Sequence, residues 1–288
     1  ETIAVYQNSP PRRLYLAGTN LFRAHGTFLD TNGFGVFLAT ILFITWGIAV
    51  SSNKGKRRWF WYGALLLQSS ALVVTFSRSA WLATIIGIAI ITIWKFRFAL
   101  KNKRVLLNLG VASIIALIVI GIVLARIPTI VDHFSTIFSP QEVSEVKWRQ
   151  NIWVYALEQV KQHPLLGTGK TMIPSDDANI VGQAESYSSH NLLIDILYQR
   201  GVVAFFIYLG FWFIFFFHGT KLLKSKKYDQ NLIMGLLAGG LAFFVSGVGT
   251  PSMIYYNLAL LFWSLLGLLI ILCCKKGESS SHLLRQLE

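Results

Sequence analysis

The chain of 288 residues is strongly apolar: 54% of its residues are hydrophobic, only 14% are charged, and its mean hydropathy is +0.55. These values exclude an ordinary soluble enzyme. The 26 basic and 13 acidic residues give a net charge of +13, which in a soluble protein would indicate a nucleic-acid partner and in a membrane protein more often indicates topology. The sequence lacks an initial Met and opens on a polar, proline-containing stretch, so we expect it to be a piece of a longer protein.

Seven apolar runs are long enough to cross a bilayer as helices, since about 20 residues span the hydrocarbon and lipid-facing backbone must be paired. A β-barrel would instead show short segments of alternating polarity. We therefore expect an all-α, polytopic transmembrane helical bundle with about seven spans, of which the third is the shortest. The runs are residues 33–50, 59–76, 80–94, 106–127, 191–217, 231–249 and 254–274.

The basic residues alternate between the connectors and so predict an orientation. Lys and Arg gather after the first, third, fifth and seventh runs, and these connectors hold well over half of the basic residues but only three acidic ones. By the positive-inside rule these connectors are cytoplasmic, and the whole net charge of +13 falls on their side. The opposite, extracytoplasmic side carries little net charge.

This orientation divides the chain into five segments. Residues 1–32 are an extracytoplasmic N-terminal segment, and residues 33–127 contain four transmembrane helices. Residues 128–190 form a long extracytoplasmic loop, residues 191–274 contain three further transmembrane helices, and residues 275–288 are a cytoplasmic tail.

The loop 128–190 is not composed like a disordered linker. Apolar residues recur at helical spacing from Trp148 to Val160, with charged and amide residues between them, which predicts an amphipathic helix at the membrane surface. His163 and Pro164, followed by two glycines, predict the end of this helix and a turn. The loop could act only as a lid over the bundle, or it could carry functional residues.

His190 is the strongest candidate for a catalytic group. It follows three serines that favour helix N-caps and directly precedes the apolar run that begins at Asn191. In the first turn of a helix the dipole disfavours a protonated imidazole, so the ring would be neutral near pH 7 and able to act as a general base. Position alone favours a simpler alternative, a histidine that caps the helix or donates a hydrogen bond at the membrane interface.

Three arginines lie on the predicted outer side. Arg78 sits between two apolar runs with almost no connector around it, where an ionisable residue is costly without a partner or an anionic ligand. Arg149 lies on the expected surface helix, and Arg23 lies just before the first run. Guanidinium groups match phosphate oxygens, so these arginines with a histidine base would suit a lipid-linked phosphate donor. Alternatively, Arg23 and Arg149 are solvated and Arg78 pairs with an acidic residue such as Asp195.

Other patterns are weaker. Asp176, Asp177 and Glu185 could hold a divalent cation, but their spacing is not specific, and solvated carboxylates explain them as well. The pair Gly239 and Gly240 in the sixth run is typical of close packing between helices. The sequence has no zinc-ligand spacing and no Gly-rich phosphate loop.

Five short motifs follow one another along the outer side of the predicted bundle. They are RAHGTF at residues 23–28, SRSAWL at 77–82, WR at 148–149 with Trp153, HPLLGTG at 163–169, and SHN at 189–191 followed by Gly201. Their order, together with the long loop between the fourth and fifth runs, resembles the O-antigen ligase and polymerase family of polytopic membrane proteins. The resemblance runs from about Arg23 to about Gly210.

The resemblance implies an inverting glycosyltransferase that uses no metal and no cofactor. Such an enzyme moves a glycan from an undecaprenyl-pyrophosphate carrier to a sugar hydroxyl at the outer face of the bacterial cytoplasmic membrane. The resemblance assigns His190 to the family's loop histidine, which deprotonates the acceptor, and Arg78 and Arg149 to the two arginines that hold the pyrophosphate. Arg23 matches a less uniformly assigned basic position. Family members usually have more spans, so further N-terminal spans are also implied.

The implied partners are the carrier-linked donor, a glycan or lipid-linked sugar acceptor, and the bilayer, without nucleic acid. Ligases use lipid A-core sugar as acceptor, polymerases use another carrier-linked repeat, and related proteins glycosylate protein; the sequence does not separate these. A non-catalytic transporter of the lipid carrier and a metal-dependent transferase also stay open. Because transporters tend to place polar groups near the midplane and this chain gathers them at one interface, we favour an enzyme.

Overall fold

The computed structural model describes residues 23–28, 30–52, 55–96, 144–169, 173–174, 185–186, 188–225, 227–250 and 256–274. Within these residues the chain forms seven α-helices and one very small sheet. The helices are α2 (Thr31–Ser51), α3 (Lys56–Val74), α4 (Arg78–Phe96), α7 (Ser144–Gln162), α9 (Leu192–Lys224), α10 (Gln230–Gly247) and α11 (Tyr256–Cys274). In the sheet, β1 (Ile173–Pro174) pairs antiparallel with β2 (Glu185–Ser186).

The expectation of an all-α bundle is confirmed for the described residues, apart from this two-residue strand pair. Six of the seven apolar runs form helices, and the run 106–127 lies outside the described residues. Five described helices, α2, α4, α9, α10 and α11, are long and apolar enough to cross a membrane. Helix α3 is not among them, because it opens with Lys56, Arg57 and Arg58 and carries the polar residues 68–70 in its interior. The count of seven spans therefore stays a prediction.

Short polar side chains fix where three of the apolar runs become helical. Asp30 accepts a hydrogen bond from the backbone N–H of Gly33 at the start of α2, and Asn191 and Asp229 cap α9 and α10 in the same way. Each cap satisfies backbone donors that have no partner inside the helix. The helix starts are thus set by single residues at the edges of the apolar runs.

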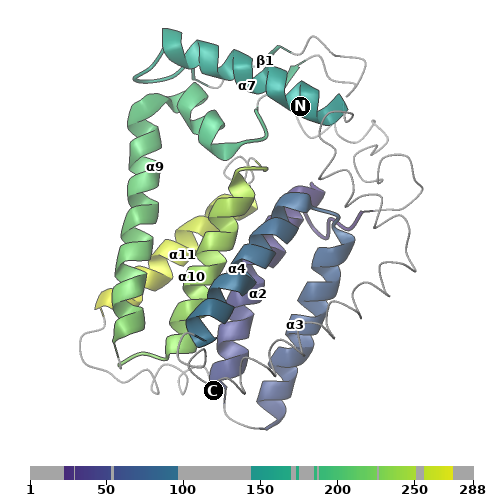
Figure 1. Ribbon diagram of the computed structural model, residues 1–288, viewed down its shortest axis with the longest axis vertical. Helices are drawn as coiled ribbons and strands as arrows, with labels where there is room; N and C mark the ends of the chain where they lie inside the picture. The colour runs from purple at the N-terminus through teal and green to yellow at the C-terminus, as the bar shows by residue number, and fades with distance from the viewer. Residues whose placement is uncertain are drawn as a thin grey trace.

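The helices run between two ends of the bundle (Figure 1), and α7 lies across one of them. We call this the α7 end. It holds the starts of α2, α4, α9 and α11 and the ends of α3 and α10. The side-chain oxygens of Ser79 on α4 and Thr250 after α10 lie 3.2 Å apart there. The opposite end is called the basic end. There Lys95 Nζ donates to Asn231 Oδ1 over 2.6 Å, and the described connectors that were expected to be cytoplasmic gather at this end.

Helix α10 packs against α2 at its centre through glycine. A Cβ added to Gly239 would lie 2.8 Å from the carbonyl oxygen of Thr40, and one added to Gly240 would overlap the ring of Phe215 on α9. The prediction of close packing at Gly239 and Gly240 is confirmed. The sequence analysis missed the reciprocal contact of Gly47 on α2, whose Cβ would lie 2.8 Å from the carbonyl oxygen of Asn231.

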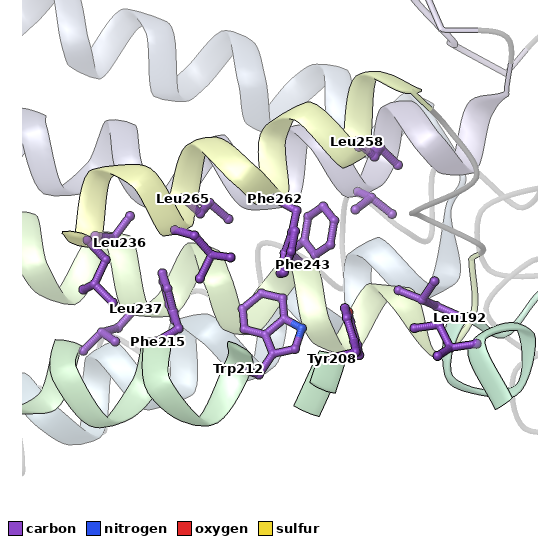
Figure 2. Close-up of a cluster of buried hydrophobic side chains, with 14 of the residues drawn as sticks. Leu192, Tyr208, Trp212, Phe215, Leu236, Leu237, Phe243, Leu258, Phe262 and Leu265 are labelled. Carbon is purple, nitrogen blue, oxygen red and sulfur yellow. The ribbon is translucent and has the colours of Figure 1, made fainter. Parts of the chain in front are cut away.

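An aromatic cluster joins α9, α10 and α11 (Figure 2). The indole of Trp212 lies at its centre, with ring centroids 5.5 Å from Phe215, 6.0 Å from Phe243 and 5.4 Å from Phe262. Such ring pairs add to the apolar burial of each side chain. The long part of α9 is therefore fixed to the bundle, and the residues that precede it have a firm support.

Candidate active site

Helix α9 is broken at Gly201, close to the α7 end. Gly201 has φ 75° and ψ −179°, a conformation that is essentially restricted to glycine. Figure 1 shows the first turns of α9 set at an angle to its long part, beneath α7. The expectation of one continuous helix over residues 191–217 is therefore wrong at this point. We call residues 192–200 the short arm of α9.

The HPLLGTG motif docks into this break. The backbone N–H groups of Thr168 and Gly169 donate to the carbonyls of Tyr198 and Gln199 over 2.9 and 3.0 Å, and Val202 N–H donates to Pro164 O over 2.8 Å. A break frees helix carbonyls and N–H groups, and these hydrogen bonds satisfy two of the carbonyls and one N–H group. The predicted end of the loop helix and the turn after it are confirmed, since α7 ends at Gln162. The partner of the turn was not predicted.

His190 lies in a tight turn at the start of the short arm. Its backbone is left-handed, with φ 56°, and its N–H donates to Ser188 Oγ over 3.0 Å. The N-cap of α9 is Asn191, whose Oδ1 accepts from Leu193 N–H at 3.0 Å and from Ile194 N–H at 3.3 Å. The expectation that a serine caps the helix is wrong, and the half-buried His190 precedes the N-cap instead of lying in the first turn.

The carboxylate of Asp195 accepts hydrogen bonds from this turn and does not pair with Arg78. Its side chain is only 4% exposed, and its two carboxylate oxygens accept from Ser188 Oγ over 2.7 Å and from Ser189 N–H over 2.6 Å. Within the part of the chain that the structure describes, the suggested pairing of Arg78 with Asp195 is therefore wrong. Ser188 and Ser189, two of the three serines that were expected to cap α9, instead bind Asp195 and hold the turn.

Helix α7 packs on the short arm and reaches the same turn. Ile152 and Ala156 of α7 are buried against Tyr198, and Arg149 lies half-buried one turn before Ile152 on this face. The indole N–H of Trp153 donates to the carbonyl oxygen of Ser189 over 2.8 Å. The helix predicted over residues 148–160 is confirmed, and it brings Arg149 to the end of the bundle where His190 lies.

Arg78 is the first residue of α4 and is half-buried at the α7 end. The turn before it is tight, with Phe76 left-handed at φ 52°. The buried Ser77 packs against α2, because a Cβ on Gly35 would lie 2.7 Å from Ser77 Cβ. The packing of α2 against this turn fixes the start of α4 and hence the position of Arg78.

Arg23 contacts the same turn from the N-terminal segment. Its guanidinium donates from Nε to Thr75 O over 3.0 Å, and from one terminal nitrogen to Phe76 O over 3.3 Å and to Asn32 Oδ1 over 3.1 Å. A cation is favourable at the C-terminal end of a helix, where carbonyls lack partners. The alternative of a merely solvated Arg23 is wrong, since the side chain holds the end of α3.

Residues 63–209 match the family model described as O-antigen ligase. The chain belongs to this family. The match covers just over half of the chain, from α3 to the long part of α9, and includes Arg78, Arg149 and His190 but not Arg23. A comparison of the chain with curated protein sequences gives no match. With its five candidate spans, the protein is a multi-pass membrane protein of the O-antigen ligase type.

The structure describes only one of the three acidic loop residues that were considered as cation ligands in this O-antigen ligase family protein. Asp176 and Asp177 lie outside the described residues, and Glu185 belongs to β2. Among the described residues, no group of three His, Cys, Asp or Glu side chains could hold a metal ion.

Sequence reasoning named Trp153, Asp195 and Gly201 but missed the roles in which all three shape the candidate site. The available signals were an acidic residue five positions after His190 and a glycine inside an apolar run. A glycine within a helical pattern indicates a possible break, but it does not predict which segment of the chain will pack against that break.

Proposed function

We propose that this protein transfers a glycan from an undecaprenyl-pyrophosphate carrier to a sugar hydroxyl at the outer face of a bacterial cytoplasmic membrane. The observation that carries the proposal is the gathering of three groups at the α7 end: Arg78 at the start of α4, Arg149 on α7 and His190 before α9. They come from separate elements, and all three lie within the residues that match the family. The domain boundaries and the assignment of the α7 end to the outer face are part of this proposal.

The chemistry is a single in-line displacement at the anomeric carbon. A bond forms between the acceptor oxygen and this carbon while the bond to the pyrophosphate oxygen breaks, so the anomeric centre is inverted. The acceptor proton passes to the imidazole of His190, and the pyrophosphate leaves with the lipid carrier. General-base assistance of this kind contributes roughly 100-fold to 10,000-fold. No metal is required, since arginine side chains neutralise the charge on the leaving group.

Different structural features favour pyrophosphate binding by the two arginines within the family match. Arg78 opens α4, where the helix dipole adds to its attraction for an anion. Arg149 approaches from α7, the helix that also contacts the His190 turn through Trp153. Fixed charges aimed at a developing anion stabilise a transition state without reorganisation. Arg23 would act on the pyrophosphate through the turn that carries Arg78.

Replacing His190 tests the mechanism directly. We expect His190→Ala to lower glycan transfer at least 100-fold while membrane insertion and thermal stability stay unchanged. Transfer would be measured in proteoliposomes with carrier-linked glycan extracted from cells that lack this protein. The matched control is His163→Ala, which removes an exposed imidazole just after α7. Normal transfer by the His190→Ala variant would overturn the mechanism, and glycan that always stays on its carrier would indicate a transporter or carrier-binding protein.

Ligase and polymerase differ in what accumulates without the enzyme. Cells lacking a ligase would hold long glycan chains on the carrier, whereas cells lacking a polymerase would hold single repeats. Analysis of carrier-linked glycans in such cells therefore assigns the acceptor class.

A further inference from the structure

The turn that carries His190 is held by several side-chain hydrogen bonds. Ser189 Oγ contacts both the N–H and the carbonyl of Asn191, at 3.2 and 3.0 Å. Ser188 Oγ accepts from His190 N–H and donates to Asp195. A left-handed conformation is sparsely populated for a residue with a Cβ, and it persists only where the surroundings over-determine it. The contacts at this turn therefore fix a backbone conformation that His190 would seldom adopt by itself.

Two side chains from outside the turn supply its anchors. The carboxylate of Asp195 holds Ser188 and Ser189 from the short arm, and the indole of Trp153 holds the carbonyl of Ser189 from α7. Asn191 already caps α9, so Asp195 is not needed to start the helix. A buried carboxylate is costly compared with an apolar side chain. Its contacts to the turn, instead of to its own helix, point to a role in placing His190.

We propose that Asp195 and Trp153 are positioning residues that hold His190 in its left-handed conformation and so set where its imidazole lies. Trp153 follows Arg149 by one helical turn on α7, so the same helix that brings Arg149 to the site also holds the turn of His190. The catalytic consequence rests on the proposed role of His190 as general base. The positioning itself does not depend on that role and is measurable without substrate.

The experiment compares Asp195→Asn and Trp153→Phe with the unmodified chain. Asp195→Asn keeps the size of the side chain, Trp153→Phe keeps an aromatic ring, and each removes one or more of the anchoring hydrogen bonds. Trp59→Phe is the matched control, because Trp59 is 76% exposed on α3 at the basic end. Diethyl pyrocarbonate modifies accessible neutral imidazoles, and peptide mass spectrometry reports its rate at each histidine. His163 serves as an internal control after α7.

We expect both variants to speed the modification of His190 by about fivefold, the factor that corresponds to the loss of one ordinary hydrogen bond. The rate at His163 should stay unchanged, and Trp59→Phe should change neither rate. In transfer assays with extracted carrier-linked glycan, kcat should fall by a similar factor with little change in KM. Trp153→Phe keeps the test valid if Asp195→Asn fails to fold.

An unchanged rate at His190 in the folded variants would overturn the proposal. An equal acceleration at His163 and His190 would also overturn it, because it would show a general loosening of α7. The experiment tests the positioning of His190 separately from its proposed catalytic role. If His190→Ala keeps full transfer while the modification rates change as expected, the positioning stands and the general-base mechanism fails.

Discussion

Arg23 changes its expected role once its contacts are considered atom by atom. The sequence presents it as one of three outer arginines. In the structure its guanidinium donates three hydrogen bonds, to Thr75, Phe76 and Asn32. Its Ala24 neighbour also donates to Val74 O over 2.9 Å, so the N-terminal segment closes the end of α3. At the residue scale, one arginine therefore acts as a cap, and Arg78, which opens the next helix, depends on it.

Replacing Arg23 should lower stability before it lowers substrate binding. We expect Arg23→Ala to cost about 1–2 kcal/mol, because hydrogen bonds from a charged donor are lost and carbonyls at the end of α3 are left without them. Thermal unfolding in detergent micelles, followed by size-exclusion chromatography, measures the loss. Arg200→Ala is the control, since Arg200 is exposed and should change stability little. An unchanged unfolding temperature for Arg23→Ala would show that the capping contacts are unimportant.

At the scale of elements, the break in α9 makes the site possible. A continuous helix of this length would be about 50 Å long, well beyond the ~30 Å of hydrocarbon that it has to cross. The break at Gly201 lets the short arm leave the direction of the long part and pass beneath α7. The short arm carries His190 before its first turn and Asp195 within it. The position of the candidate base therefore depends on a backbone conformation eleven residues later.

Gly201 should not tolerate even a methyl group. A Cβ there would overlap the carbonyl of Leu165, and its φ of 75° is unfavourable for any other residue. We expect Gly201→Ala to destabilise the protein by at least about 1–3 kcal/mol, the usual cost of such a conformation. Gly210→Ala on the same helix is the control, because nothing lies within 4 Å of its Cβ and alanine favours a helix. Equal unfolding temperatures for the two variants would contradict this account of the break.

The sequence predicts elements better than it predicts their partners, and α9 shows why. Apolar length alone dictates helix over its residues, since any backbone facing lipid must pair internally. The break depends on Pro164 to Gly169, more than thirty residues earlier, and no local pattern connects the two segments. Likewise, the serines before His190 are residues that favour helix caps, but two of them donate hydrogen bonds to the carboxylate of Asp195. Long-range hydrogen bonds, not propensity, decide these positions.

Across the whole molecule, the basic residues distinguish the two ends of the bundle, and the exposed apolar side chains indicate a side that faces lipid. Large apolar side chains stay exposed on the outer side of α9 and α11, among them Phe206, Phe213 and Trp263. So many exposed large apolar side chains are unusual for a soluble monomer and suit a bilayer. The described connectors rich in Lys and Arg share the basic end, and the candidate site lies at the other. We therefore interpret the net charge of +13 as a signal of orientation and not of substrate.

Labelling of single cysteines tests this orientation. In a background where Cys273 and Cys274 are replaced by Ser, the Val154→Cys variant places a thiol on α7, where Val154 is 65% exposed. The Lys224→Cys variant places one at the end of α9, where the side chain is also exposed. By the positive-inside rule, a membrane-impermeant maleimide should label the first variant in intact spheroplasts and the second only after permeabilisation. The reverse pattern would place the candidate site at the cytoplasmic face and remove it from a carrier-linked glycan presented outside.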